Sequence, residues 1–300
     1  MTWRSYGLGV AVPLLLTEPD AAGRAARDAR ARTRRRFLMC PPDHFEVVYS
    51  INPWMDPSVP VDRRRAARQW ERLVATYCDL GHQVELVPPV AGAPDMVFSA
   101  NSAIVVDGRV LAARFRRPER APEQDPYRRW FAERGYTDVR AARTFSEGEG
   151  DFAVTAELML GGWGIRSSRG AHVEAQEFFG VPVVSLRLID ARFYHLDLAL
   201  CVLDEHTVAY YPGAFSGGSR RVLRRLFPGG IEVGESDALA LGLNAVSDGY
   251  HVVLPSTARA FADRLRARGY EPVPVDMSEF HKAGGAVKCC TLELRGRSAR

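Results

Sequence analysis

The sequence has few cysteines and almost no lysine. Its five cysteines are an odd number and include no Cys-x-x-Cys pair, which argues against a disulfide framework and against a cysteine-ligated zinc site. We therefore expect reduced thiols in a cytoplasmic protein, with neither a metal nor another cofactor. The only two lysines, Lys282 and Lys288, both lie close to the adjacent cysteines Cys289 and Cys290.

Long apolar runs and a basic body are also missing from the sequence. No apolar stretch approaches the ~18 residues that a membrane helix needs, so we expect no membrane partner. Residues 1–36 hold eight arginines and three acidic residues, which leaves the rest of the chain close to neutral despite a formal net charge of +4. Because a near-neutral body offers no electrostatic footprint for nucleic acid, we expect no nucleic-acid partner, which leaves a small-molecule partner open. The sequence leaves open whether the protein forms a homodimer.

Five similar units follow one another along the chain, each roughly 40 to 60 residues long, a period typical of propellers and solenoids. In each unit a helical pattern leads to a short strand, a polar turn and a hairpin. The periodicity predicts helices over 61–81, 125–135, 171–179, 218–227 and 257–269. No Gly-x-Gly-x-x-Gly follows a strand, which disfavours a dinucleotide-binding α/β fold.

The two ends of the repeat complement each other. The final strand, 291–294, has no partner downstream, and the strand-like segment 37–50 has none upstream, so pairing the two would close a ring. We therefore predict a mixed α/β (α+β) fold: a five-bladed α/β propeller in which each blade combines a helix with three strands. We expect residues 36–296 to form this single domain and residues 1–35 to be a poorly ordered N-terminal extension.

Polar or reactive residues occupy the same place in every unit, at the strand end before the hairpin. They are Asn101, Glu149 with Asp151, His195 with Asp197, Asn244 and Cys289. Taken singly, each has an ordinary explanation as a turn residue, a cap or a buried core residue. In a closed ring, however, equivalent positions converge on one axis, so their recurrence at one phase of the repeat favours an active site.

A thiol, an imidazole and several carboxylates in one pocket suit attack on the carbon of a positively charged group. Carboxylates hold a planar guanidinium or amidinium through bidentate hydrogen bonds. We predict that Cys289 is the nucleophile, His195 the general acid and base, and Glu149 the carboxylate that orients His195. A cysteine peptidase is the weaker interpretation, because a neutral amide substrate would not need so many acids.

Five motifs resemble those of the guanidino-modifying enzymes of the pentein fold, which include dimethylarginine dimethylaminohydrolases, arginine deiminases, arginine dihydrolases and amidinotransferases. The motifs are Asn52-Pro53-Trp54-Met55, Phe98-Ser99-Ala100-Asn101, Glu149-Gly150-Asp151, His195-Leu196-Asp197 and Gly284-Gly285-Ala286-Val287-Lys288-Cys289. The resemblance extends from Arg36 to Leu294 and is closest to dimethylargininases. It implies a pentein five-bladed α/β propeller that hydrolyses the guanidino group of arginine or N-methylated arginine, giving citrulline and an amine through a covalent intermediate on Cys289.

The resemblance also implies a set of substrate-binding residues. Asp151, Asp197 and Asn101 would hold the guanidinium, and Arg120 and Arg166 would bind the substrate carboxylate. Asn52 would belong to a loop that closes over the α-amino group. Asn244, the polar residue of the fourth unit, joins this substrate-binding set, whereas Cys290 would be a neighbour of the nucleophile without a catalytic role.

Two departures from the dimethylargininase pattern leave the substrate and the final acceptor open. Dimethylargininases carry an acid at the position of Asn101, and asparagine there is more similar to arginine dihydrolases, which continue to ornithine. The sequence His195-Leu196-Asp197 is more similar to arginine deiminases and amidinotransferases. Transfer of the amidino group to an acceptor amine is therefore the alternative function. A non-catalytic ligand-binding propeller is disfavoured, because it would need neither the thiol nor the histidine.

Overall fold

The computed structural model describes residues 32–296, which contain five three-stranded sheets. In each sheet, one outer strand is antiparallel to the middle strand and the other outer strand is parallel to it. A helix connects the two parallel strands in every unit, because parallel neighbours need a crossover connection.

The strands and the main helix of each unit follow the same order. The first unit contains β15 (Leu292–Glu293), β1 (Arg36–Met39), α2 (Arg63–Asp79) and β2 (Gln83–Leu86). The second contains β3 (Ala103–Val106), β4 (Arg109–Ala112), α3 (Gln124–Glu133) and β5 (Val139–Ala141). The third contains β6 (Phe152–Val154), β7 (Met159–Trp163), α5 (Arg169–Phe179) and β8 (Val183–Arg187). The fourth contains β9 (Leu200–Val202), β10 (Val208–Tyr210), α6 (Gly217–Leu226) and β11 (Ile231–Glu232). The fifth contains β12 (Val246–Ser247), β13 (His251–Pro255), α8 (Arg259–Ala267) and β14 (Glu271–Val275).

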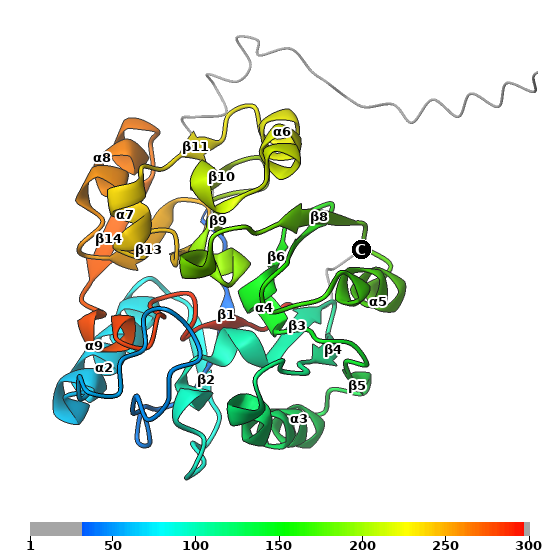
Figure 1. Cartoon of the computed structure of the whole chain (residues 1–300), viewed down its shortest axis with the longest axis vertical. Coiled ribbons are helices and arrows are strands. Elements are labelled where there is room, and N and C mark those ends of the chain that lie inside the picture. The colour runs from blue at the N-terminus through cyan, green and yellow to red at the C-terminus, as the bar shows by residue number, and fades with distance from the viewer. Residues whose placement is uncertain (1–31, 297–300) are drawn as a thin grey trace, which may run out of the picture. The chain divides into compact units, whose positions relative to one another are not determined.

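Pairing between β1 and β15 closes the ring. Phe37 lies opposite Glu293 and Leu38 opposite Leu292 in an antiparallel pair, as the sequence predicted. Figure 1 shows the five units arranged around a common centre, with α2, α3, α5, α6 and α8 on the periphery. The fold is therefore the predicted five-bladed α/β propeller. The predicted extension over residues 1–35 falls mainly on residues 1–31, which lie outside the described residues.

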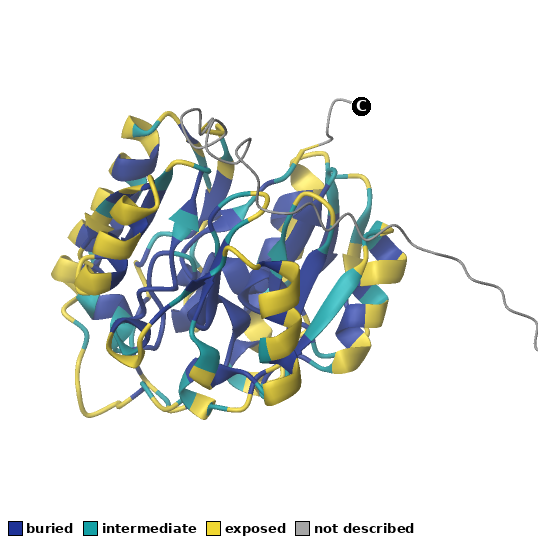
Figure 2. Cartoon of the chain, turned by 90° about the horizontal axis from the view of Figure 1, so that it is seen from above, coloured by how far each residue is buried: buried dark blue, intermediate teal, exposed yellow. Residues whose placement is uncertain are grey.

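The helices form where an apolar stripe faces the sheets. In α2 the buried side chains include Ala66, Trp70, Leu73 and Tyr77, which recur at three- and four-residue spacing. The helix begins after Asp62, whose carboxylate accepts a hydrogen bond from the Arg65 backbone N–H and satisfies a free donor of the first turn. Figure 2 shows that exposed residues gather on the outer sides of the helices while the strands are mostly buried. None of the described helices is both long and apolar enough to cross a bilayer.

Short helical turns precede the first strand of each unit. They are η2 (Ser99–Ser102), α4 (Gly148–Asp151), η5 (Leu196–Leu198), α7 (Glu235–Leu239) and α9 (Ser278–His281). Three of them carry polar residues of the repeat: Asn101 lies in η2, Glu149 and Asp151 in α4, and Asp197 in η5. Asn244 and Cys289 lie outside the turns of their units. These turns replace the simple loops that the sequence suggested before each hairpin. The segment 37–50 also differs from expectation, because only Arg36–Met39 is a strand and the prolines at 41 and 42 end it.

Candidate active site

Cys289 is buried, and Asn244 holds it in place from two sides. The Asn244 Oδ1 accepts hydrogen bonds from the backbone N–H groups of Ala286 (3.0 Å) and Cys289 (3.1 Å). Its Nδ2 lies 3.1 Å from the Cys289 Sγ and donates to it. Asn244 was predicted to bind substrate, but its side chain contacts the cysteine loop and, through Nδ2, the Asp197 carbonyl at 3.3 Å. These contacts fix the position of the Cys289 thiol.

Asp197 lies against the same sulfur. Its Oδ2 accepts the hydrogen bond of the Cys289 thiol at 3.3 Å, and within the described chain its buried Oδ1 has no hydrogen-bond partner. Burial raises the pKa of Asp197 to about 7, against the lowering effect of the nearby Lys288 charge. Burial and the adjacent Asp197 carboxylate raise the pKa of the Cys289 thiol well above its usual value. An anionic acceptor and a thiol at this separation create a site that favours a bound cation.

His195 is hydrogen-bonded to Glu147, not to the predicted Glu149. The His195 Nε2 lies 2.7 Å from the Glu147 Oε2, and a carboxylate can only accept, so Nε2 carries the proton. On the other side of the ring, Nδ1 lies 3.4 Å from the Asn101 amide nitrogen. Burial alone would raise the pKa of Glu147, but the hydrogen bond and charge of His195, with the charge of Arg166, lower it to about 2.

The phase of one helical turn explains why the assignment of Glu149 was wrong. Glu147 precedes α4 and Asp151 ends it, so the two are four residues apart and share a face, while Glu149 points the other way. On that other side Glu149 forms ion pairs with Lys288, at 2.5 Å, and with Arg295. The sequence contained this information, because a helical conformation of residues 147–151 directs the side chains of Glu147 and Glu149 to different faces.

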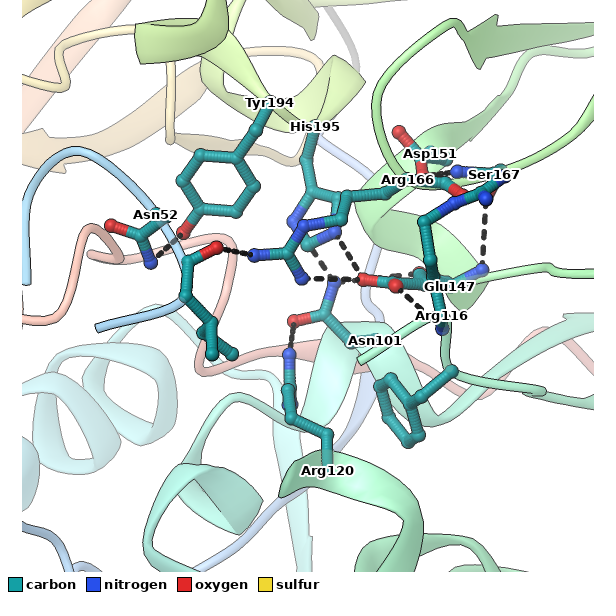
Figure 3. Close-up of polar contacts among 12 residues, drawn as sticks. Asn52, Asn101, Arg116, Arg120, Glu147, Asp151, Arg166, Ser167, Tyr194 and His195 are labelled. Atoms are coloured by element: carbon teal, nitrogen blue, oxygen red, sulfur yellow. Dashed lines mark hydrogen bonds and ion pairs between the residues drawn. The ribbon is translucent and has the colours of Figure 1, made fainter. Parts of the chain in front are cut away.

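A small cavity opens in front of Cys289. The space between the atoms that surround it is about 250 Å³. Its lining includes Asn52, Asp95, Asn101, Arg120, Arg166, Tyr194 and Cys289. Figure 3 shows Arg166, His195 and Asn101 converging on Glu147, with Arg120 below Asn101 and hydrogen-bonded to it. The chain thus brings residues from five distant segments to one buried space.

Both predicted carboxylate-binding arginines line this cavity, and both are paired with acids of the protein. Arg120 forms a buried bidentate pair with Glu123, through contacts of 2.7 Å each, and its NH1 donates to the Asn101 Oδ1 at 2.8 Å. Arg166 donates to Glu147 at 3.1 Å and to the Ile51 carbonyl at 2.8 Å. Since these contacts use part of each guanidinium's donor set, a substrate carboxylate would share or displace them.

Two residues predicted to hold a guanidinium are otherwise engaged. The Asp151 carboxylate accepts hydrogen bonds from the backbone N–H groups of Ser167 (3.1 Å) and Leu196 (3.2 Å), one on each oxygen. Asp151 therefore fixes the backbone around His195, and its predicted contact with a guanidinium is not supported. The Asn101 Oδ1 already accepts from Arg120, which leaves its amide nitrogen toward His195.

The loop containing Asn52 closes the cavity. The Asn52 Nδ2 donates to the Ala283 carbonyl at 3.0 Å and lies 3.3 Å from the Tyr194 hydroxyl. Gly284 has a φ of +78° here, and a Cβ at this position would lie 2.8 Å from the Trp54 ring, so a side chain would push the loop away. Asn52 was predicted to belong to a loop that closes over the substrate α-amino group, and in the structure it lines the cavity.

Sequence reasoning missed Asp95, which also lines the cavity. The Asp95 Oδ2 accepts from the Tyr49 hydroxyl at 3.0 Å, while its buried Oδ1 has no partner among the described residues. Burial raises the pKa of this carboxyl. A buried acceptor without a donor usually indicates a missing ligand. Asp95 lies in η1 (Pro94–Val97), the short helix before the one that contains Asn101, so it falls outside the position that recurs in every unit.

Metal binding finds no support in the arrangement of ligands. Within residues 32–296, no group of three or more His, Cys, Asp and Glu side chains could hold a metal ion. All five cysteines are free thiols.

Two known proteins and a solved structure of one of them place this site in context, although no family model matches the sequence. An N(G),N(G)-dimethylarginine dimethylaminohydrolase of Mycobacterium tuberculosis is 52% identical over 275 residues, which cover 91% of this chain and 91% of that protein. The bifunctional arginine dihydrolase/ornithine cyclodeaminase ArgZ of Synechocystis is 38% identical over 265 residues, covering 86% of this chain and 37% of ArgZ. A solved structure of the ArgZ N-terminal domain, in a variant covalently bound to a reaction intermediate, matches with a TM-score of 0.83 at 37% identity, covering 87% of this chain and 98% of that domain.

Proposed function

Since the chain belongs to the dimethylarginine dimethylaminohydrolase family, we propose that Cys289 is the nucleophile with which it hydrolyses the guanidino group of arginine or N-methylated arginine. The observation that carries this proposal is the contact of 3.3 Å between the Cys289 thiol and Asp197, a carboxylate with a free buried oxygen. A guanidinium that pairs with this oxygen would bring its carbon close to the sulfur, so that positioning lowers part of the barrier. The covalent intermediate on the ArgZ domain supports the same chemistry.

The bound substrate activates the thiol. The raised pKa of Cys289, caused by burial and by Asp197, keeps the thiol protonated in the empty site. A guanidinium cation neutralises the Asp197 carboxylate and stabilises a neighbouring thiolate. The enzyme is therefore reactive mainly when the correct cation is present, which protects the buried thiol from other electrophiles.

Substrate recognition at the far end of the cavity uses the remaining charged residues. Arg120 and Arg166 supply N–H donors for the α-carboxylate, in the planar geometry that suits bidentate contacts. The free Oδ1 of Asp95 and the Asn52 loop provide acceptors for the α-ammonium group. Because the cavity is already closed by the Asn52 contacts, this loop has to open for substrate to enter and for product to leave.

Catalysis proceeds through a covalent amidino-enzyme. The Cys289 sulfur adds to the guanidino carbon, and the thiol proton passes to the His195 Nδ1, which is the ring nitrogen that does not contact Glu147. His195 then protonates the departing nitrogen, the carbon–nitrogen bond breaks, and ammonia or a methylated amine leaves. Water attacks the same carbon, gives its proton to His195, and the carbon–sulfur bond breaks to release citrulline and restore the thiol.

Hydrolysis that continues to ornithine is the second candidate function. It is favoured by the similarity to ArgZ, described as an arginine dihydrolase, and by Asn101, whose amide replaces an acid in the cavity. An amide at this place removes one negative charge from the guanidinium end. A less acidic site binds a neutral ureido group more readily than a fully acidic site does, so the first product can undergo a second hydrolytic step.

Product analysis of a matched cysteine pair tests the proposal. Arginine and Nω,Nω-dimethylarginine are each incubated with the wild type, Cys289→Ala and Cys290→Ala, and citrulline, ornithine, ammonia and dimethylamine are quantified. We expect Cys289→Ala to lose activity by about 10³-fold or more, whereas Cys290→Ala, which alters an equally buried neighbouring thiol, retains most of it. Equal loss in both variants, or turnover by Cys289→Ala, would contradict the thiol mechanism.

A further inference from the structure

A second concave region lies on the periphery, away from the cavity at Cys289. It is a groove between α5 and α6 whose floor is one face of β8, and Figure 1 shows β8 between these two helices. A smaller hollow continues the groove along α5, and the two share Arg169 and Ser185.

The groove concentrates positive charge. Arg169, Arg187, Arg221 and Arg225 line it, and no acidic residue does so within the described part of the chain. Four positive charges at one place equal the formal net charge of the whole protein, +4. This local excess is not visible in the charge balance of the sequence, which predicts a nearly neutral body.

These four guanidinium groups have no ion-pair partner among residues 32–296. Arg224, on the same helix, is different because it pairs with Glu232 at 2.8 Å. Arg221 and Arg225 are four residues apart on α6 and therefore share a helix face. Unpaired arginines that face one hollow repel one another, so an anion bound between them removes this repulsion.

Trp163 holds two of the arginines in place at one end of the groove. The guanidinium carbons of Arg169 and Arg187 lie 5.4 and 5.5 Å from the centroid of the Trp163 ring, within the range of a cation–π contact. Side chains held in this way lose less conformational entropy when they bind a ligand. The groove therefore resembles a prepared site more than a random surface of long side chains.

The edge of β8 disfavours a bound peptide strand. The Val183 N–H already donates to the Gln176 side chain at 3.3 Å, and the Arg187 N–H donates to the Ser219 hydroxyl at 2.8 Å. A peptide that added a strand here would have to break both hydrogen bonds. A compact anion with several charges fits the groove better, since planar guanidinium groups match the oxygen geometry of phosphate.

We propose that this groove binds a chain of phosphoryl groups, as carried by a nucleoside triphosphate or by inorganic polyphosphate. Arg221 and Arg225 contact the phosphoryl oxygens from α6, and Arg169 and Arg187 contact them from the opposite side. This site is separate from the guanidino chemistry, because none of its lining residues lines the cavity at Cys289.

Calorimetric titration of the full chain tests the proposal with tripolyphosphate, ATP and a short DNA duplex as probes. The variant Arg221→Gln/Arg225→Gln removes two exposed charges from the groove. Its matched control, Arg264→Gln/Arg266→Gln, removes two exposed charges from α8. We expect the groove variant to weaken tripolyphosphate binding by at least about tenfold for each arginine, and the control variant to bind like the wild type.

The two possible sources of the phosphoryl chain give different results. Tighter binding of ATP than of tripolyphosphate identifies a nucleotide ligand, and equal binding identifies the phosphoryl chain alone. A fluorescence change on binding that disappears in Trp163→Phe places the ligand in the groove. Equal weakening by both double variants, no weakening by the groove variant, or DNA binding as tight as that of tripolyphosphate overturns the proposal.

Discussion

Glu147 and Glu149 are two positions apart and chemically identical, yet their surroundings assign them different tasks. Glu147 contacts His195 and Arg166, both buried beside the cavity. Glu149 contacts Lys288 and Arg295, which are partly exposed. A carboxylate that fixes the tautomer of a catalytic histidine affects rate, whereas one in a structural ion-pair network affects mainly stability.

Substitution of each glutamate by glutamine separates these tasks. We expect Glu147→Gln to lower kcat by about 10²- to 10⁴-fold, because the neutral amide no longer fixes the Nε2–H tautomer of His195. We expect Glu149→Gln to change kcat by less than about tenfold and to reduce the free energy of unfolding by about 1–3 kcal/mol. Steady-state kinetics and urea unfolding of both variants provide the check. A larger loss of kcat in Glu149→Gln than in Glu147→Gln would reverse the assignment.

The protonation of Asp197 predicts a pH dependence of substrate capture. Its pKa of about 7, raised by burial, means that the carboxyl is largely protonated below pH 7 in the free enzyme. A protonated carboxyl lacks the charge that pairs with a guanidinium, so kcat/KM for arginine should rise with pH up to about 7 and then level off, since kcat/KM reports groups of the free enzyme.

Asp197→Asn provides the control for this pH profile. The amide has no proton to lose in this range, so the variant should have a low kcat/KM without the rise that ends near pH 7. The measurement is kcat/KM between pH 5 and 9 for both proteins. An unchanged rise in Asp197→Asn would assign the titration to another group.

At the scale of elements, short helical turns and glycines place the site residues. The turn α4 approaches η2 and η5 so closely that a Cβ on Gly150 would lie 2.0 Å from the Asn101 amide nitrogen and 3.4 Å from the His195 ring. The absence of a side chain at position 150 is therefore what allows residues from three successive units to meet.

A methyl group at this position should disrupt the meeting of the turns. We expect Gly150→Ala to lower kcat/KM by at least about tenfold, because a shift of even 1 Å in catalytic groups is costly, and to destabilise the fold by about 1–3 kcal/mol. Gly180→Ala is a comparison for stability alone, because its φ of +70° strains a side chain although no atom lies within 4 Å of the added carbon. If Gly150→Ala retained full activity, the close approach of these turns would not be needed for catalysis.

At the scale of the whole molecule, closure of the ring connects the stability of the fold to the position of Cys289. Cys289 is separated by only two residues from β15, and β15 pairs with β1 at the other end of the described chain. The loop that carries the thiol is thus anchored by the same strand that closes the propeller. Loss of this pairing should release both together.

Leucine-to-alanine substitutions compare the closing strand with the periphery. Leu292 is fully buried in β15, whereas Leu226 of α6 is 39% exposed. We expect Leu292→Ala to reduce the free energy of unfolding by about 2–5 kcal/mol, and Leu226→Ala by less than about 1 kcal/mol. Denaturant unfolding followed by fluorescence measures both. Equal effects would mean that closure contributes no special stability.

The sequence by itself determined the architecture and indicated which residues to propose as reactive. Five repeated helix–strand–hairpin units, unpaired first and last strands, and one polar position per unit predict a closed ring with a converging site. These features depend on local periodicity, which the order of residues contains directly. Cys289, His195 and Asp197 could therefore be chosen from their positions in the repeat alone.

The tertiary structure decided which partner each of those residues has. Glu147, and not Glu149, contacts His195. Asp151 accepts hydrogen bonds from backbone N–H groups, and Asn244 holds the loop that carries the Cys289 thiol. Four arginines gather in a groove that no acidic residue of the described chain lines. The physical reason is that the direction of a side chain depends on the phase of a short turn and on how neighbouring blades meet. Contacts between distant segments set both, and no local pattern in the sequence records them.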